Sequence, residues 1–530
     1  MAKIDLLIQG GKIVDGTGSP WRQQDLAVHE GKIIDIGRGI PSSAADEVIH
    51  ATDLIVAPGF VDAHSHADIT LLADQEMEYR IMQGITTEVV GQDGLSYAPV
   101  SKENLQAWRR YLKGLNGEFS DDVAWNWRST GELLQRYEGK ASNAVHLVPH
   151  GAVRVEVMGW ADRPARADEL SRMQDLVTRS LEEGAAGLST GLTYIPCSHA
   201  STKEMIALCT PVGKAGGILS IHLRSYGAQL LTAVEEAITI GRRTGAGIHI
   251  SHLRMADPST WGLAGRVLDL IDQARKEGVD VTFDIYPYTV GCAPLFCLLP
   301  PWAQHGGPDA VLNRLRDAGT RARISEDMDA WSLDWSNYSL SNAPHPDFQE
   351  WEGRPVTEAA AAGEMNTFQL LMDVLLKTEL DSTIIAEGGS EEDNLVMLKH
   401  PAGMIGSDGV LVGGHPHPRG FGTYPRLLTA YVRDNPVLRL EEAVRKMTAA
   451  PAGRHQLLHR GTLTVGSAAD VVVFSLEELE DHSTYQDPRQ LPEGMHSVLI
   501  NGRVVVREGK YLGSTSGRAL RPLSPKRRMV

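Results

Sequence analysis

Residues 55–66 read IVAPGFVDAHSH, an apolar run that ends in two histidines separated by one serine. The run has the composition of a strand that is buried on both faces. Side chains at positions i and i+2 of a strand point to the same face, so His64 and His66 are expected to converge at the end of this strand. Imidazole is a ligand that zinc and its neighbouring metals prefer. The stretch therefore predicts a buried strand with part of a metal site at its end.

Short apolar runs of the same kind recur along the middle of the chain. They alternate with longer helical patterns, such as residues 167–184 and 229–244, which is typical of βα units around a parallel sheet. Eight runs fit this pattern, at residues 55–63, 87–90, 144–149, 187–190, 218–221, 247–251, 279–285 and 404–407. Eight strands with helices between them predict an α/β fold of the closed (β/α)8 TIM-barrel type. No GxGxxG or Walker-type glycine loop follows a strand, which disfavours a nucleotide-binding sheet.

Both ends of the chain show a different sequence pattern, in which short β-rich runs are separated by glycine turns. Near the C-terminus, residues 471–474 form such a run, and Asn501-Gly502 is a hairpin signal. Two β-rich ends around a different middle indicate that the termini meet in one accessory domain. We therefore expect residues 1–57 and 456–530 to build that domain beside a barrel formed by residues 58–455.

The connection between the seventh and eighth predicted strands is unusually long. It runs from Tyr286 to Gly403 and contains several prolines and tryptophans. A long insertion on the catalytic face of a barrel is usually a lid or a substrate wall. We expect a lid-like insertion at about residues 287–375, with a surface embellishment as the alternative.

The composition limits the function. A formal net charge of −16 argues against sequence-independent binding to nucleic acid, which needs a basic face. The four cysteines, Cys197, Cys209, Cys292 and Cys297, form no CxxC pair and are expected as free thiols in a reducing cytoplasm. No apolar stretch approaches the ~18 residues of a membrane span. We expect a cytoplasmic protein without a nucleic-acid or membrane partner, and assembly into a homo-oligomer stays open.

Polar residues stand at the ends of later predicted strands as well. Asp93 follows the second strand, His222 the fifth, His252 the sixth and Asp408 the eighth. The carboxyl ends of barrel strands gather on the face that carries the active site. A single histidine after a strand is more often a hydrogen-bonded rim residue than a ligand. The whole set, together with the histidine pair of the first strand, predicts a metal site.

These motifs resemble a known superfamily. The His64-Ser65-His66 motif, the single histidines and Asp408 are similar to the amidohydrolase superfamily, and the flanking β segments resemble its β-sandwich, built from both termini. Four stretches resemble the N-acyl-D-amino-acid deacylase (D-aminoacylase) family more closely: GLSTGLTY at 187–194, DIYPY at 284–288, IGSDG at 405–409 and HPR at 417–419. The resemblance extends over nearly the whole chain.

The resemblance implies metal-dependent hydrolysis of N-acyl-D-amino acids to a carboxylate and a free D-amino acid. It implies one or two zinc ions per chain, or another divalent metal, held by His64, His66, Asp93, His222, His252 and Asp408. A bound metal lowers the pKa of its water towards ~7, and Asp408 stands where a carboxylate could move the proton. The family has a cysteine where this chain has Asp93. We therefore expect a harder oxygen ligand at that position, with a turn aspartate as the alternative.

An N-acyl amino acid also carries a free carboxylate that needs cations near it. Arg254 and Arg419 are the candidates, because a guanidinium binds a carboxylate through two parallel hydrogen bonds. Tyr194 and Tyr286 could supply hydroxyl donors. A salt bridge at the rim is the alternative for each arginine.

Two other functions stay open at this point. A cyclic amidohydrolase, acting on hydantoin, diketopiperazine or lactam rings, would use the same metal centre. The absence of a lysine at the end of the fourth strand, where Ser189 and Thr190 stand, weighs against the hydantoinase type. A non-catalytic scaffold of the same fold is the other alternative. The joint presence of the histidines and Asp408 weighs against it.

Overall fold

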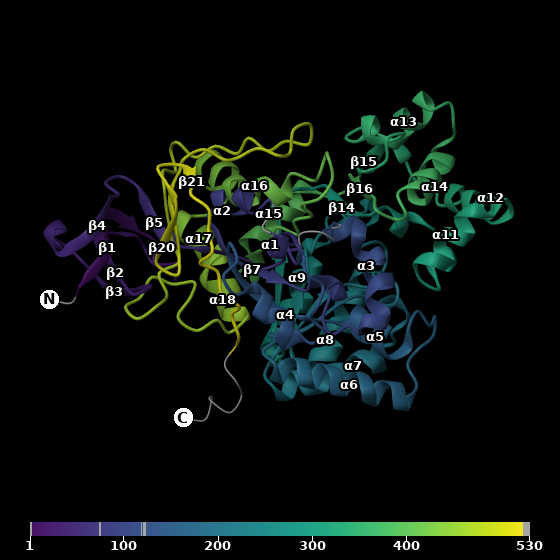
Figure 1. Cartoon of the computed structure of the whole chain (residues 1–530), viewed down its shortest axis with the longest axis horizontal. Coiled ribbons are helices and arrows are strands. Elements are labelled where there is room, and N and C mark those ends of the chain that lie inside the picture. Colours follow the sequence, from purple (N-terminus) through teal and green to yellow (C-terminus); the bar gives the residue numbers. More distant parts are fainter. Residues whose placement is uncertain (1–2, 74–75, 118, 120–122, 523–530) are drawn as a thin grey trace.

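The two ends of the chain meet in one sheet of nine strands, and a larger α/β unit lies beside it (Figure 1). The computed structural model describes residues 3–73, 76–117, 119 and 123–522. The nine strands are β1 (Ile4–Ile13), β2 (Arg22–His29), β3 (Lys32–Gly37), β4 (Ala45–His50), β5 (Ile55–Pro58), β18 (Val471–Phe474), β19 (Met495–Ile500), β20 (Arg503–Arg507) and β21 (Lys510–Tyr511). Strand β5 is parallel to β1 and antiparallel to β18, so it joins the two ends.

Apolar side chains from both ends share one core. Leu6, Ile8 and Val56 are buried together with Val471 and Leu499. All residues of β18 are buried, because this strand has a neighbour on each side and packed side chains on both faces. Burial of this apolar surface therefore needs both ends of the chain. The predicted accessory domain also includes residues 1, 2 and 523–530, which lie outside the described residues.

Short parallel strands form the centre of the larger unit. They are β6 (Phe60–Asp62), β7 (Ile85–Val90), β8 (Asn143–His146), β9 (Val148–Pro149), β10 (Gly187–Gly191), β11 (Ile218–His222), β12 (Gly247–Ile250), β13 (Val281–Ile285) and β17 (Gly403–Ile405). They pair in the orders β6-β7-β8 and β17-β13-β12-β11-β10-β9. Backbone hydrogen bonds link the two groups at both edges, from Ala63 N to Ile405 O (3.3 Å) and from Ala186 N to His146 O (2.9 Å).

Helices follow most of these strands, as the sequence pattern predicts. The helical patterns at 167–184 and 229–244 are confirmed as α6 (Ala167–Glu182) and α8 (Leu230–Thr244). Helix α8 ends before Gly245, whose φ of 71° closes the helix in the left-handed region. The other helices of this unit include α3 (Lys102–Asn116), α5 (His150–Met158), α7 (Thr202–Lys214), α9 (Ala264–Lys276), α15 (Glu391–Lys399), α16 (Arg419–Leu428), α17 (Leu440–Met447) and α18 (Ala449–Arg454). Among the described helices, none has the length and apolar character to cross a membrane.

Two of the predicted strands are divided, so their predicted extents are wrong. The run at 55–63 contains β5 of the terminal sheet and β6 of the parallel group, and they are separated by Gly59. A side chain at Gly59 would lie 2.3 Å from Oγ1 of Thr86, so only glycine allows this close passage. The run at 144–149 is divided at Leu147, because β8 pairs with β7 while β9 pairs with β10.

The long connection between β13 and β17 has a sheet of its own. Strands β14 (Gly291–Pro294), β15 (Tyr338–Asn342) and β16 (Thr383–Ala386) pair antiparallel, with β16 in the middle. Helices α11 (Pro308–Arg316), α12 (Ala318–Asp329), α13 (Val356–Ala362) and α14 (Thr367–Lys377) lie in the same lobe, at the upper right of Figure 1. The sheet extends past the expected boundary at residue 375, because β16 supplies its central strand.

Candidate metal centre and substrate cavity

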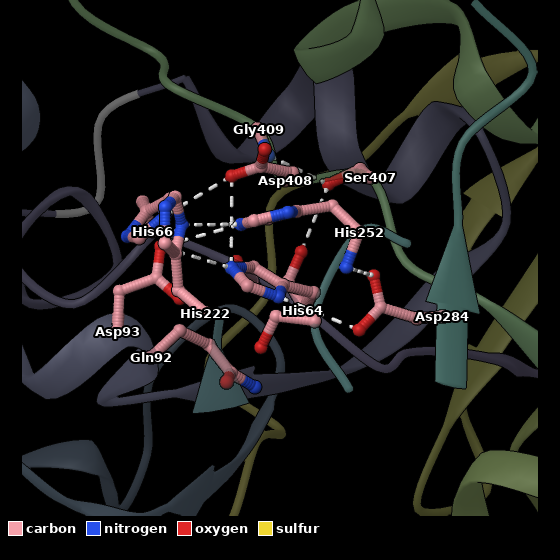
Figure 2. Close-up of polar contacts among 12 residues, drawn as sticks. His64, His66, Gln92, Asp93, His222, His252, Asp284, Ser407, Asp408 and Gly409 are labelled. Atoms are coloured by element: carbon pink, nitrogen blue, oxygen red, sulfur yellow. Dashed lines mark hydrogen bonds and ion pairs between the residues drawn. The ribbon is translucent and has the colours of Figure 1, made fainter. Parts of the chain in front are cut away.

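The six residues predicted as metal ligands lie together at the carboxyl ends of the parallel strands (Figure 2). They stand at or just after the ends of β6, β7, β11, β12 and β17: His64, His66, Asp93, His222, His252 and Asp408. The carboxyl ends of parallel strands lie on one face of the fold, so residues far apart in the sequence meet there. A hydrogen bond from Asp408 N to His64 O, 2.8 Å long, joins the first and last of these strand ends.

Four imidazole nitrogens surround one carboxylate oxygen. The oxygen is Oδ2 of Asp93, and it lies 3.7 Å from Nε2 of His64, His66 and His252 and 3.8 Å from Nδ1 of His222. These distances exceed the ~2.7–3.2 Å of an N–H···O hydrogen bond. They fit atoms that share a metal ion, because zinc bonds of about 2.0–2.2 Å leave two ligand atoms ~3–4 Å apart.

Several polar atoms of this cluster are buried without a hydrogen-bond partner among the described residues. They include Nε2 of His64, Nδ1 of His66 and Oδ1 of Asp93. An unsatisfied buried polar atom costs about 1–3 kcal/mol, and a cation would satisfy such atoms. One ligand atom from each of His64, Asp93, His252 and Asp408 lies within 4.8 Å of all the others. The residues present therefore fit a divalent metal.

The backbone is strained at three of these residues. Asp93, His252 and Asp408 have φ angles of 57°, 32° and 50°, in the region that favours glycine. Such a conformation costs on the order of 1–3 kcal/mol and persists only where the surroundings fix it. The two aspartates each precede a glycine, so they are turn residues as well as members of the cluster.

Charge around the cluster favours ionised carboxylates. Burial by itself raises the pKa of Asp93, but the adjacent histidines outweigh burial and hold this pKa well below its usual range. Burial likewise raises the pKa of Asp408, while the Arg419 guanidinium and the histidines lower it further than burial raises it. Both groups therefore carry a negative charge at neutral pH, as metal ligands must.

Asp284 holds two of the histidines, although the sequence alone did not identify it as a site residue. Its Oδ1 accepts a hydrogen bond from His252 N at 2.9 Å, and its Oδ2 lies 3.5 Å from Nδ1 of His64. His249 contacts the same Oδ2 through Nε2 at 2.9 Å. With its Nδ1 towards Asp284, the ring of His64 presents Nε2 to the cluster. The DIYPY motif contains Asp284, but no pattern in a single sequence indicates this contact.

A buried ion network lies behind the first and last strand ends. Arg80 is fully buried and donates to Glu88 at 2.8 and 2.9 Å, and also to Asp62. Asp62 in turn accepts hydrogen bonds from Ser407 N (2.7 Å) and His64 N (3.2 Å). The network therefore fixes the backbone beside His64 and beside Asp408. Sequence reasoning missed it, because a buried arginine has no signature in composition or periodicity.

The four residues predicted to bind substrate line a cavity in front of the cluster. Nη1 of Arg419 lies 2.8 Å from Oδ2 of Asp408, and its guanidinium carbon lies 4.8 Å from the ring centre of Tyr286. Arg254 donates to the hydroxyl of Tyr286 at 2.7 Å. The ring of Tyr194 lies 4.7 Å from that of His222. The cavity has a volume of about 180 Å³, and His66, Asp93, His222, His252 and Asp408 open onto it.

The inserted lobe supplies much of the rest of the cavity wall. Most of these further lining residues are apolar and come from β14, β16 and the segments next to them: Cys292, Ala293, Pro294, Leu298, Ile384 and Ala386. Leu95 and Leu115 extend the same surface. The sequence predicted a lid or wall here, but not which residues would reach the cavity.

Comparison with known proteins gives consistent results. A family model described as "Amidohydrolase family" matches residues 47–506. The chain is 33% identical to a D-aminoacylase from Alcaligenes xylosoxydans xylosoxydans, over 97% of each chain. It is also 33% identical to an N-acyl-D-aspartate deacylase from the same organism, over 98% of this chain and 96% of that protein. A crystal structure of N-acyl-D-glutamate deacylase from Bordetella bronchiseptica, complexed with zinc and a phosphonate mimic of the tetrahedral intermediate, superposes with a TM-score of 0.84 at 30% identity. It covers 98% of this chain and 100% of the other.

The first prediction concerns Asp93. Asp93→Ala removes the oxygen that four imidazoles share, so the metal content of purified, dialysed protein should fall well below that of the unmodified chain. Asp93→Cys should restore part of the zinc binding, because a thiolate is a good zinc ligand. Elemental analysis by mass spectrometry measures both. Asp317→Ala, at an exposed helix cap in the inserted lobe, is the control and should keep its metal. Full metal content in Asp93→Ala would remove Asp93 from the ligand set.

The second prediction concerns Asp284. Asp284→Asn should weaken metal affinity by ~10–100-fold, because the ring of His64 loses its charged partner. Competition with a metal-binding dye measures the affinity. Asp280→Asn is a matched control near the other end of β13, where Asp280 is largely exposed and pairs with Arg454. Equal affinities in both variants would assign Asp284 to fold stability alone.

Proposed function

The chain belongs to the amidohydrolase family, and we propose that it hydrolyses the amide bond of N-acyl-D-amino acids to a carboxylate and a free D-amino acid. The observation that carries the proposal is the arrangement of four imidazole nitrogens around one oxygen of Asp93, beside a cavity that contains Arg254 and Arg419. The cluster of candidate metal ligands supports amide hydrolysis, and the arginines support a substrate with a free carboxylate. The names of the D-aminoacylase and deacylase relatives support the D configuration.

We infer that the parallel strands form one closed (β/α)8 barrel. Hydrogen bonds at both edges of the two strand groups support this, as does the parallel direction of every pairing. We infer that the nine-stranded sheet built from both termini is the β-sandwich that we expect beside such a barrel. In this arrangement the inserted lobe stands over the catalytic face, which agrees with its contribution to the cavity wall.

The residues that would hold the metal are the six strand-end residues, with Asp93 in contact with both the histidine pair and the two single histidines. When bound, a divalent metal such as zinc lowers the pKa of a water molecule to about 7 and polarises the amide carbonyl. Asp93 stands where the family has a cysteine, so its oxygen makes the site harder and favours metals that accept oxygen ligands.

Asp408 is the residue we propose to move the proton. Its Oδ1 lies 3.2 Å from Nε2 of His66, and its Oδ2 pairs with Arg419 at the cavity wall. The lowered pKa keeps this carboxylate ionised, so Asp408 carries no proton before the reaction begins. It would then deliver the proton to the amine that leaves as the amide bond breaks. The left-handed backbone at Asp408 holds the carboxylate at this point.

Arg419 and Arg254 would bind the α-carboxylate of the substrate, with Tyr286 between them. Arg419 is almost fully buried, so its charge is poorly screened by water and interacts strongly with an anion. The hydroxyl of Tyr194 would donate to the acyl or carboxylate group. A cavity of about 180 Å³ suits one acylated amino acid and is smaller than the ~300–1,000 Å³ of sites for drug-sized ligands.

We also propose a cytoplasmic location. Cys197, Cys209, Cys292 and Cys297 are all free thiols. Burial raises the pKa of Cys209 and of Cys297, which keeps both thiols protonated and unreactive. Cysteines that form no disulfide are typical of a reducing compartment.

Asp408→Asn tests the proton transfer. Asparagine keeps the size of the side chain but accepts no proton, so kcat for N-acetyl-D-amino acids should fall by ~100-fold or more while much of the metal stays bound. Steady-state kinetics and metal analysis on the same preparation separate the two effects. A kcat close to that of the unmodified enzyme, with metal present, would show that another group transfers the proton.

Arg419→Ala tests the recognition of the carboxylate. Loss of a charge-assisted, buried pair costs ~2–4 kcal/mol, so kcat/KM for N-acyl-D-amino acids should fall tenfold to several-hundredfold. The same variant leaves Asp408 without its partner, which should slow every substrate to a similar degree. The measurement is therefore the loss in kcat/KM for each N-acyl amino acid compared with the loss in kcat/KM for its neutral amide analogue. Arg419→Lys, which keeps the charge, should show a smaller difference. Equal losses on charged and neutral substrates would favour the cyclic-amide alternative.

A further inference from the structure

We propose that Thr193 is a positioning residue for the metal centre. Its hydroxyl group holds the imidazole ring of His222 in the orientation that presents Nδ1 to the cluster. Oγ1 of Thr193 lies 2.8 Å from Nε2 of His222. The proposal rests on the ligand set proposed above and goes further, because it assigns the orientation of one ligand to a residue outside that set.

His222 differs from the other three histidines of the cluster in the nitrogen that it presents. It faces Oδ2 of Asp93 with Nδ1, at 3.8 Å, whereas the other three imidazoles face the same oxygen with Nε2. Nε2 of His222 is therefore left for a partner outside the cluster. The hydroxyl group of Thr193 is that partner.

The contact with Thr193 determines which way round the ring lies. A half-turn of the ring about its Cβ–Cγ bond exchanges Nδ1 with Cδ2 and Nε2 with Cε1. The flipped ring would place a carbon atom towards Asp93 and another towards Thr193, and the hydrogen bond would be lost. The rings of Tyr194 and Tyr226 lie 4.7 and 4.9 Å from that of His222 and limit its tilt, but a flipped ring would keep these contacts.

The same contact determines where the ring proton lies. A neutral imidazole carries one N–H group, so ligation through Nδ1 needs the proton on Nε2. Oγ1 of Thr193 can accept a hydrogen bond from that N–H, which favours the tautomer with a lone pair on Nδ1. Nδ1 of His222 also lies 2.9 Å from Nε2 of His252. When both of these nitrogens bind a cation neither carries a proton, so their mutual contact cannot hold the ring, and the hydrogen bond to Thr193 remains.

A tight turn after β10 brings Thr193 to the ring. Gly191, the last residue of β10, pairs with His222 at the end of β11. The amide of Leu192 donates to the carbonyl of His222 at 3.1 Å, and the amide of Tyr194 donates to that of Gly191 at 3.0 Å. A side chain at Gly191 would lie 2.7 Å from the backbone oxygen of Asp93, so only glycine allows this passage. The turn is thus built against both His222 and the segment of Asp93.

Thr193→Val tests the proposal, because it removes the hydroxyl group and keeps the shape of the side chain. Thr193 is exposed, so the variant should fold, as circular dichroism can verify. Its zinc affinity, measured by competition with a metal-binding dye, should fall by ~10-fold or more. Thr193→Ser keeps the hydroxyl group and should restore most of the affinity. Thr178→Val is the matched control, since Thr178 is an exposed threonine that donates within its own helix, to Gln174 O at 2.8 Å. Unchanged affinity in Thr193→Val would overturn the inference.

A double-mutant cycle tests whether Thr193 acts through His222. In a His222→Ala background, Thr193→Val should cause no further loss of zinc affinity, because no ring is left to orient. An equal loss in both backgrounds would overturn the inference, since Thr193 would then act by another route. Full affinity in His222→Ala alone would contradict the ligand role of His222 and this inference with it. Failure of Thr193→Val alone would leave that ligand role and the proposed function intact.

Discussion

One oxygen of Asp93 has imidazole nitrogens from three different strand ends around it at 3.7–3.8 Å, and most of the architecture serves to keep this arrangement. Atoms of this cluster such as Nε2 of His64 and Oδ1 of Asp93 are buried without a hydrogen-bond partner among the described residues, which is costly unless a cation is bound. The surrounding protein therefore has to fix each ring by other means. Asp284 contacts His64 and His252. The Arg80 network holds the backbone beside His64 and beside Asp408, at the first and last strand ends.

Much of the site was predictable from the sequence because its residues follow local rules. The pair His64 and His66 has the spacing of one strand face, and Asp93, His222 and Asp408 each stand at the end of a buried apolar run. The resemblance of these motifs to the amidohydrolase superfamily is confirmed by the family model and the full-length relatives. The ligand roles of these residues stay predictions, supported by the geometry of the cluster.

Other features could not be predicted because they depend on contacts between distant parts of the chain. Arg80 and Asp284 act through partners that no local pattern indicates. The division of the run at 55–63 depends on Thr86, which leaves no room for a side chain at Gly59. The inserted lobe could be located by its length, but its apolar face towards the cavity follows from the pairing of β14 with β16. The strand-end cluster thus comes from the parallel strands, while an apolar wall of the cavity comes from a separate sheet, so the two can change independently.

The single residue between β5 and β6 has a consequence for how the protein matures. Strand β5 completes its pairing only with β18, from the far end of the chain, and β6 continues directly into His64 and His66. The segment that carries the histidine pair is thereby tied to a sheet whose last four strands, β18 to β21, come from the far end of the chain. Contacts of such high sequence separation form late, since a long loop must close first. A nascent chain halted before β18 would therefore carry all six predicted ligands but would lack the strand that pairs with β5, next to the segment of the histidine pair.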